Sequence, residues 1–304
     1  MQIAGADTVL WGELRPSAGV TLRHARVRPS GGPPQGTVVL LHGRTEFIEK
    51  YDEVMGLLCQ RGFQVVTMDW RGQGLSTRPL GDRHKGHIDD FTTYVRDLSL
   101  FVDEVARPAS RGPLYLVSHS MGGNIVLHYL RSRPGVFRRV FLTSPMVAIR
   151  LGPASAAVKA LVRLAARLGR ETAYVPGTGP YQGGGHRFDG NDLTSDPARF
   201  ERIHALIAQA PDLALGGPTL GWLSQAMRAS DCLFEAGYAE GITTPTTFVV
   251  AGSDSVVDND KTAALARRMV SAEVLCVGGS QHELLNERDV FTEQFWAAFD
   301  VQAG

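Results

Sequence analysis

The chain has 304 residues, and 31 Lys and Arg residues balance 31 Asp and Glu residues. A formal net charge of zero gives no electrostatic reason to expect nucleic acid as a partner, and the 43% of hydrophobic and 20% of charged residues exclude a disordered chain. The length fits one large domain or a domain with an insertion.

The cysteines and the N-terminus bear on the compartment. Cys59, Cys232 and Cys276 lack the spacing of a zinc site or a disulfide framework. The first residues include Asp7 and Glu13 and no apolar run after a basic start, unlike a signal peptide. No run approaches the ~20 apolar residues that a membrane-spanning helix needs. We therefore expect reduced cysteines and a cytoplasmic protein.

Residues 1–145 alternate short apolar runs with helical periods. Runs typical of buried strands occur at residues 38–42, 63–70, 114–118 and 136–145. Helices are expected near residues 51–59, 91–105 and 121–131. This alternation predicts an α/β fold with a mostly parallel sheet that helices cover on both faces.

The pattern changes between residues 146 and 241, where helical stretches contain no convincing strand. Alternation then resumes with strands expected at 246–252 and 272–278, and helices at 261–269 and 290–299. We expect one α/β core formed by residues 1–145 and 242–304, with a helical insertion at residues 146–241.

The strongest functional signal is LYLVSHSMGGNIVLHYL, in which Ser120 stands between a strand-like run and a helix-like run. A serine on such a tight turn is exposed at the positive end of the helix dipole, and its neighbours must be small because the two backbones approach closely. Gly122 meets this need, whereas Ser118 stands where glycine is expected. We predict that Ser120 is a nucleophile; the alternative is a serine of an ordinary turn.

A serine nucleophile needs a base that takes its proton and an acid that orients the base, and in folds with this turn both follow the serine in the chain. His282, directly after an expected strand, is the predicted base. The other histidines fit less well, since His186 and His204 belong to the insertion and His128 to the helix after the turn. Asp254, after another strand end, is the predicted acid.

Asp258 and Asp260 lie in the same loop as Asp254. Asp254 is favoured because it directly follows the strand-ending Gly-Ser, where the rigid sheet would fix it. We expect Asp258, the alternative, to cap the helix that begins near Lys261 instead.

Ester cleavage also needs hydrogen-bond donors for the negative charge that develops on the carbonyl oxygen. The main-chain N–H of Met121 points into that region because of the serine turn. The second donor is expected from HGRTEF, after the first core strand, as the N–H of Arg44. The alternative for His42 and Gly43 is a plain strand-ending turn.

Several segments, in this order, resemble the α/β-hydrolase family of bacterial lysophospholipases and monoacylglycerol lipases: HGRTEFIEKY, MDWRGQGLS, HKGHIDDFTTYVRDL, SHSMGG, TSPM, GSDSVVD and GSQHELLNE. The resemblance covers about residues 37–299 and is weakest in the insertion. It implies a serine hydrolase whose insertion caps an acyl pocket. The implied site residues are a triad of Ser120, Asp254 and His282 and an oxyanion hole of the Arg44 and Met121 amides.

We therefore expect a serine ester hydrolase that needs no metal or organic cofactor and acts on a small-molecule ester such as a lysophospholipid or a monoacylglycerol. The same triad could act on short-chain esters, N-terminal peptide amides or a carbon–carbon bond, and a binding protein that has lost turnover is the alternative from another class. No motif indicates the oligomeric state, the acyl-chain length or the headgroup. The pair His84 and His87 lacks a third ligand at a characteristic spacing, so no metal site is expected.

Two cationic features allow further interpretations. Lys159, Arg163 and Arg167 recur every four residues in the insertion. Such a helix can lie weakly on an anionic surface, peripheral to the inner membrane, although we favour a helix that covers the core with its charges in solvent. The Arg44 side chain could contact a lysophospholipid phosphate; the simpler expectation is an outward-pointing loop arginine.

Overall fold

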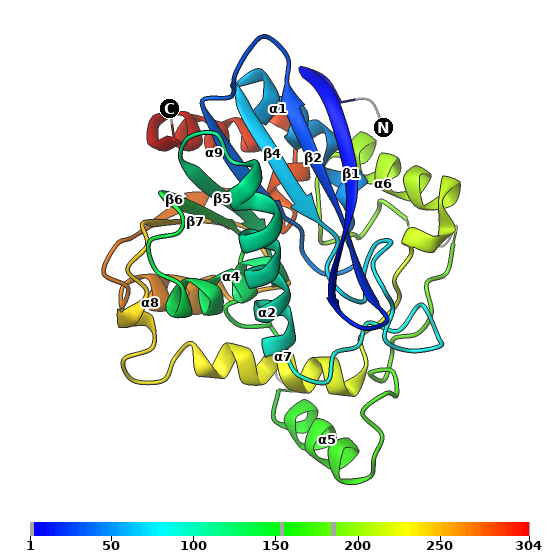
Figure 1. The fold of residues 1–304 in the computed structure, drawn as a ribbon. Helices are drawn as coiled ribbons and strands as arrows, with labels where there is room; N and C mark the ends of the chain where they lie inside the picture. Colours follow the sequence, from blue (N-terminus) through cyan, green and yellow to red (C-terminus); the bar gives the residue numbers. More distant parts are fainter. Residues whose placement is uncertain (1–2, 153–154, 184–186, 304) are drawn as a thin grey trace.

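The computed structural model describes residues 3–152, 155–183 and 187–303. Within these ranges the chain forms an eight-stranded sheet in the order β1-β2-β4-β3-β5-β6-β7-β8 (Figure 1). The strands are β1 Ala6–Ser17, β2 Val20–Pro29, β3 Gly36–Leu41, β4 Phe63–Met68, β5 Leu114–His119, β6 Arg139–Thr143, β7 Thr246–Ala251 and β8 Ala272–Val277. Strands β3 to β8 are parallel, whereas β2 pairs antiparallel with both β1 and β4.

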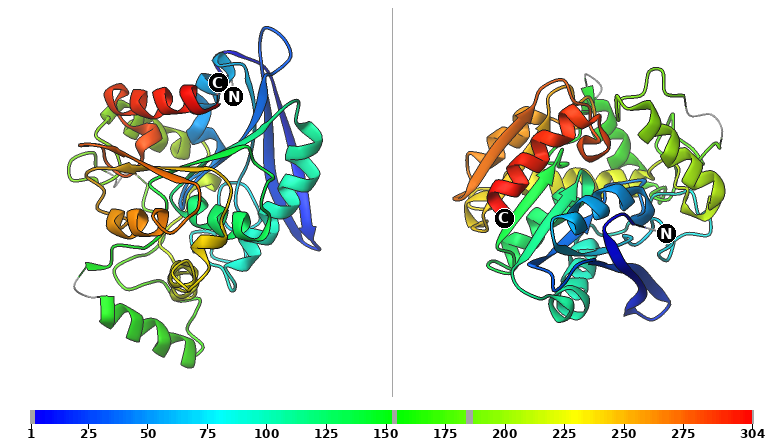
Figure 2. Two further views of the ribbon diagram at one scale, coloured as in Figure 1. Left: turned by 90° about the vertical axis from the view of Figure 1, so that its left-hand side faces the viewer. Right: turned by 90° about the horizontal axis from the view of Figure 1, so that it is seen from above.

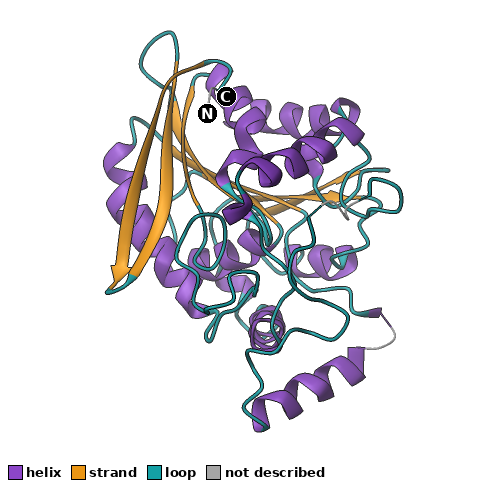
Figure 3. Ribbon diagram, turned by 90° about the vertical axis from the view of Figure 1, so that its right-hand side faces the viewer, coloured by secondary structure: helices purple, strands orange, loops and turns teal. Residues whose placement is uncertain are grey.

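Helices cover both faces of this sheet (Figure 3). They are α1 Asp52–Gln60, α2 Thr92–Phe101, α3 Arg107–Ala109, α4 Met121–Ser132, α5 Ser155–Arg167, α6 Pro197–Gln209, α7 Leu220–Cys232, α8 Asn259–Ala266 and α9 Asp289–Ala303. Val38 and Leu40 of β3 belong to the core with α1 and α9, whereas Val39 and Leu41 belong to the core with α2 and α4. Alternate residues of one apolar strand are thus buried on opposite faces, which confirms the predicted α/β-hydrolase fold class.

The chain between β6 and β7, residues 144–245, is called the β6–β7 segment below and contains α5, α6 and α7. Helix α7 contributes Trp222 and Leu223 to the core beside α2 and α4. Helix α5 stands away from the body and packs on α7 (Figure 2) through its buried residues Val162 and Ala165. No helix within the described ranges combines the length and the apolar character that crossing a bilayer requires.

The hairpin of β1 and β2 is not among the predicted elements. Strand β1 lies at the edge of the sheet, and its residues Leu10 and Trp11 are exposed. In β2, Leu22, Ala25 and Val27 are buried, but the residues between them do not form a regular alternation of apolar and charged side chains. Continuous apolar runs identify strands that are covered on both faces, so they do not reveal this half-exposed hairpin.

Candidate active site

Ser120 lies on a sharp turn between β5 and α4, with a φ angle of 49°. This left-handed conformation costs free energy for any residue with a side chain and marks the strand-to-helix turn of serine nucleophiles. The Ser120 N–H donates to the Thr143 carbonyl (3.0 Å), and the Ser120 carbonyl accepts from the N–H groups of Gly123 and Met146 (2.9 Å each). These bonds hold the strained residue between β5 and the end of β6.

Two close approaches around Ser120 require glycine. A Cβ atom on Gly122 would lie 2.5 Å from Ser118 Oγ and 2.6 Å from the His42 carbonyl oxygen. A Cβ atom on Gly43 would lie 3.1 Å from Ser120 Cβ. Ser118 fits at the tight position, but its buried hydroxyl has no hydrogen-bond partner among the described residues.

Ser118→Ala is therefore expected to retain activity and to leave the melting temperature equal or higher. It removes a buried, unpaired hydroxyl, whose desolvation costs about 1–3 kcal/mol, and leaves Cβ in place. Thermal unfolding checks this. Thr194→Val is the matched control, because it removes a buried hydroxyl that donates to the Asn286 carbonyl (2.7 Å) and should lower the melting temperature. A lower melting temperature for Ser118→Ala would contradict the account.

The structure brings the three predicted triad residues together at the C-terminal edge of the sheet. His282 Nε2 lies 3.0 Å from Ser120 Oγ, and His282 Nδ1 lies 2.8 Å from Asp254 Oδ2. All three side chains are buried. With its proton on Nδ1, directed at Asp254, the imidazole presents a lone pair on Nε2 to the serine hydroxyl. This arrangement can deprotonate Ser120.

Asp254 is held in its ionised form. Burial by itself would raise the pKa of this carboxyl, but the hydrogen bond and charge of His282, together with the N–H groups of Val257 and Val256, outweigh burial and lower the pKa. Oδ1 accepts from Val256 N (2.8 Å) and Val257 N (3.0 Å), so Oδ2 remains for His282. Asp258 has the other role that was predicted for it: its Oδ1 accepts from Lys261 N (3.1 Å) and caps α8.

The other histidines considered as the base make different contacts. His128 Nδ1 pairs with the Tyr238 hydroxyl (2.5 Å). His204 packs on Phe200 within α6, and His186 lies outside the described residues. The pair considered for a metal is also engaged, since His87 lies between Thr219 Oγ1 (2.7 Å) and Asp89 Oδ1 (2.8 Å), and His84 Nδ1 accepts from Tyr181 N (2.9 Å).

The loop after β3 and the start of α4 both carry free main-chain donors. Among the described residues, the N–H groups of Arg44 and Met121 have no hydrogen-bond acceptor. Gln73 lies between the two loops: its Oε1 accepts from Thr45 N (2.7 Å), and its Nε2 lies 3.5 Å from Met121 Sδ. Both amides are therefore available to bind an oxyanion, and Gln73 from MDWRGQGLS supports the loops that hold them.

A buried ionic bridge joins this loop to the histidine loop. Lys50 Nζ lies 2.5 Å from Glu46 Oε1 and 2.6 Å from Glu283 Oε1, and Glu46 also accepts from the N–H of Gly43. Burial alone would lower the pKa of Lys50, but the two carboxylates outweigh burial and raise the pKa. This bridge was not predicted from the sequence. The i, i+4 spacing of Glu46 and Lys50 was its only signal, and nothing in the sequence indicated Glu283 as the third member.

His119 adds a neutral ring against the catalytic histidine candidate. The centroids of the His119 and His282 rings are 4.9 Å apart, and burial lowers the pKa of His119 to about 3. His119 is therefore uncharged at neutral pH and packs beside His282 without repelling the imidazolium that would form during proton transfer.

The Arg44 side chain does not point outward as the simpler expectation held. Its Nη2 donates to the Gly216 carbonyl in the β6–β7 segment (2.7 Å), and Cζ lies 5.2 Å from the centre of the Trp222 ring. Attraction between a guanidinium and the face of an indole ring turns the side chain inward.

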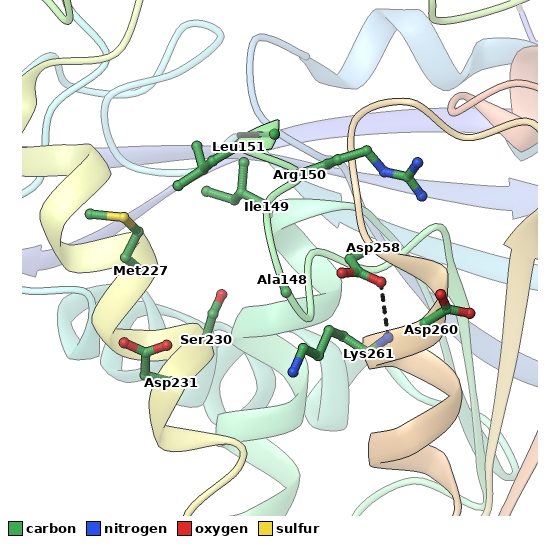
Figure 4. Close-up of a pocket in the computed structure, with 11 residues that line it drawn as sticks. Ala148, Ile149, Arg150, Leu151, Met227, Ser230, Asp231, Asp258, Asp260 and Lys261 are labelled. Atoms are coloured by element: carbon green, nitrogen blue, oxygen red, sulfur yellow. Dashed lines mark hydrogen bonds between the residues drawn. The ribbon is translucent and has the colours of Figure 1, made fainter. Parts of the chain in front are cut away.

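A pocket of about 610 Å³ lies between the loop after β6, helix α7 and the start of α8 (Figure 4). Its apolar part includes Ile149, Leu151 and Met227. The polar and charged part of the lining includes Arg150, Ser230, Asp231, Asp258, Asp260 and Lys261. The triad residues do not line it, but Asn124 on α4 connects the two regions: Nδ2 donates to the Met146 carbonyl (2.8 Å) and lies 3.4 Å from Ser230 Oγ.

Comparisons with known proteins agree with this architecture. A family model described as "Serine aminopeptidase, S33" matches residues 32–289. "Lysophospholipase L2" of Escherichia coli (strain K12) is 33% identical over 260 residues, which cover 83% of this chain and 75% of that protein. "Monoglyceride lipase" of Mus musculus is 34% identical over 120 residues, which cover 40% of this chain and 38% of that protein. A solved structure of monoglyceride lipase from Saccharomyces cerevisiae has a TM-score of 0.76 at 20% identity and covers 96% of this chain and 94% of that chain.

Proposed function

The chain belongs to the serine aminopeptidase S33 family of α/β-hydrolases and is an ester hydrolase similar to lysophospholipases and monoglyceride lipases, and from this premise we propose that it cleaves the acyl ester of lysophospholipids or monoacylglycerols through an acyl-enzyme on Ser120. The observation that carries this proposal is the contact of His282 with both Ser120 and Asp254, at 3.0 and 2.8 Å. The names of the relatives support a lipid ester as the substrate.

In the first step, His282 takes the hydroxyl proton as Ser120 Oγ attacks the ester carbonyl carbon. The Arg44 and Met121 amides donate to the carbonyl oxygen as it becomes negative, and one such donor lowers the barrier by about 3 kcal/mol. His282 then gives the proton to the leaving alcohol oxygen. In the second step, His282 takes a proton from a water molecule whose oxygen attacks the acyl carbon. His282 then returns this proton to Ser120 Oγ as the bond between Oγ and the acyl carbon breaks and the fatty acid leaves. Apart from the substrate and one water molecule, each step uses only groups of this chain.

The β6–β7 segment supplies the substrate side of this proposal. Residues 146–241 act as a cap over the core of residues 1–145 and 242–304, and the pocket beside Ile149 and Met227 receives the acyl chain. The apolar side chains of Ile149, Leu151 and Met227 suit a hydrocarbon chain.

The experiment that tests the function is a comparison of initial rates on four substrates at equal enzyme concentration. These are a lysophospholipid, a monoacylglycerol, a p-nitrophenyl butyrate ester and an aminoacyl p-nitroanilide. We expect the two lipid esters to give the highest kcat/KM. Faster turnover of the anilide than of the lipid esters would favour the alternative of N-terminal peptide amides as substrates. If none of the four substrates is turned over, the alternative of a binding protein would be favoured.

We further propose that α5 rests weakly on a membrane, which would keep a cytoplasmic enzyme peripheral to the inner membrane. Leu161, Leu164 and Leu168 are 38%, 52% and 64% exposed, and their spacing of three and four residues puts them on one side of the helix. Arg167 is exposed nearby, whereas the side chains of Lys159 and Arg163 lie outside the described part.

Changing Leu161, Leu164 and Leu168 to serine together is expected to lower co-flotation with anionic liposomes at least about tenfold, because apolar area that can enter the interface is lost. Val301→Ser is the matched control, since Val301 is 85% exposed on α9, outside the β6–β7 segment. Equal flotation of wild-type protein and triple variant would contradict membrane contact through α5.

A further inference from the structure

Arg44 carries a charge that the described residues leave without an acidic partner. Its Nη2 donates to the Gly216 carbonyl, its Nε is buried without an acceptor, and no carboxylate in the described part lies within ion-pair distance of its guanidinium. Burial lowers the pKa of Arg44 to about 10, so the group stays charged at neutral pH. Arginine has five N–H donors, and a single one of these donors on Arg44 is bonded to another described residue.

Three other wholly or partly buried cations of the described part pair with carboxylates, whereas Arg78, like Arg44, donates only to carbonyl oxygens. These pairs are Lys50 with Glu46 and Glu283, Arg23 with Glu49 and Asp69, and Arg71 with Asp97. Removing a cation from water without a counter-charge is unfavourable. An anion that arrives with the substrate would offset this cost at Arg44.

The topology puts Arg44 on the side of the nucleophile that would receive the alcohol part of an ester. Arg44 follows β3, the pocket residue Ala148 follows β6, and β5, which ends at the serine turn, lies between these two strands. An ester whose acyl chain extends toward the pocket therefore directs its alcohol toward the β3 side. In a lysophospholipid, the phosphate lies a few bonds beyond the ester oxygen, a span comparable to an extended arginine side chain.

We propose that the Arg44 guanidinium binds the headgroup phosphate of a lysophospholipid and thereby favours phosphate-bearing substrates over neutral monoacylglycerols. The proposal rests on the proposed function and specifies its substrate. Planar guanidinium groups bind phosphate oxygens through paired N–H donors, and these bonds are strongest where water is excluded. The Arg44 amide would then bind the ester carbonyl oxygen, and the Arg44 side chain would bind the phosphate of the same substrate.

The test compares Arg44→Gln, Arg44→Lys and wild-type enzyme on lysophosphatidylglycerol and on a monoacylglycerol with the same acyl chain, both kept monomeric. The ratio of kcat/KM, phospholipid over monoacylglycerol, is expected to fall about tenfold to a hundredfold in Arg44→Gln, with a smaller fall in Arg44→Lys. Arg78→Gln is the matched control. Arg78 is a half-buried arginine that donates to the carbonyls of Gly72 and Gly74 and, in the same β6–β7 segment, to those of Asp212 and Ala214. Its loss therefore loosens that segment and should leave the ratio unchanged.

A second measurement is independent of turnover. In a Ser120→Ala background, calorimetry with ether analogues of the two lipids should show that Arg44→Gln weakens binding of the phosphate-bearing analogue more than that of the alkylglycerol. Equal losses of kcat/KM or of affinity for both lipids would overturn the inference. Arg44 would then only stabilise the position of the β6–β7 segment. The inference would also be overturned if Arg44→Gln left the kcat/KM ratio unchanged but weakened inhibition by free fatty acid, because Arg44 would then act on the carboxylate of the product. Failure of the wild-type enzyme to hydrolyse either lipid would instead reject the proposed function.

Discussion

Ser120→Ala is expected to reduce kcat on acyl esters by roughly a million-fold, because the variant cannot form the acyl-enzyme and keeps only the residual rate that binding and the oxyanion donors support. The remaining donors and base cannot replace a covalent step. Steady-state hydrolysis of p-nitrophenyl butyrate and of a monoacylglycerol measures this loss.

The variant should remain folded, since the removed Oγ contacts only His282 among the described residues, and alanine keeps the main-chain bonds that hold the turn. The positive φ angle of Ser120 already strains any residue with a Cβ atom, so alanine adds no new strain there. The prediction would be contradicted if Ser120→Ala kept the melting temperature of the wild type and still hydrolysed esters at a substantial, enzyme-dependent rate. Another residue would then be the nucleophile.

Asp254→Asn should lower kcat about ten-thousandfold with little change in KM. An asparagine at this position can present its NH₂ group to His282 Nδ1, which places the imidazole proton on Nε2 and removes the lone pair that faces Ser120. The pH profile of kcat on a p-nitrophenyl ester measures the effect.

Asp258→Asn is the matched control for this prediction. Asn caps a helix about as well as Asp, so the α8 N-terminus stays capped and activity should be retained. A large loss in Asp258→Asn with nearly full activity in Asp254→Asn would exchange the roles of the two aspartates.

Much of the fold could be predicted from local patterns. Continuous apolar runs predicted the parallel strands β3 to β7, because strands covered on both faces show a signal within a few residues of chain. Strand β8 was predicted by the same kind of run, although most of its residues are exposed or half-buried at the other edge of the sheet. The edge hairpin of β1 and β2 has no such run. The limits of residues 146–241 as a cap stay a prediction, since they depend on how the segment acts and not on where its helices begin.

The site divides in the same way. Ser120, Asp254 and His282 each follow a recognisable strand end, so the sequence could indicate them separately, and the structure adds their mutual distances. Their catalytic roles stay predictions until they are measured. The bridge of Glu46, Lys50 and Glu283 could not be predicted, because residues far apart in the chain form it only after the sheet is assembled.

The orientation of Arg44 was likewise beyond the sequence. It depends on Trp222 and Gly216, which come from the β6–β7 segment, where the family resemblance is weakest. A loop arginine points into solvent unless another part of the chain provides acceptors and an aromatic face, and those partners become visible only in the assembled molecule.

The most direct test of the account is peptide mapping by mass spectrometry after treatment with a fluorophosphonate, which reacts with an activated serine. The account predicts one adduct per chain, on Ser120, with little adduct in Asp254→Asn or His282→Ala because the hydroxyl is then not activated. An adduct on another serine, or equal labelling of Ser120 in the His282→Ala protein, would contradict the account.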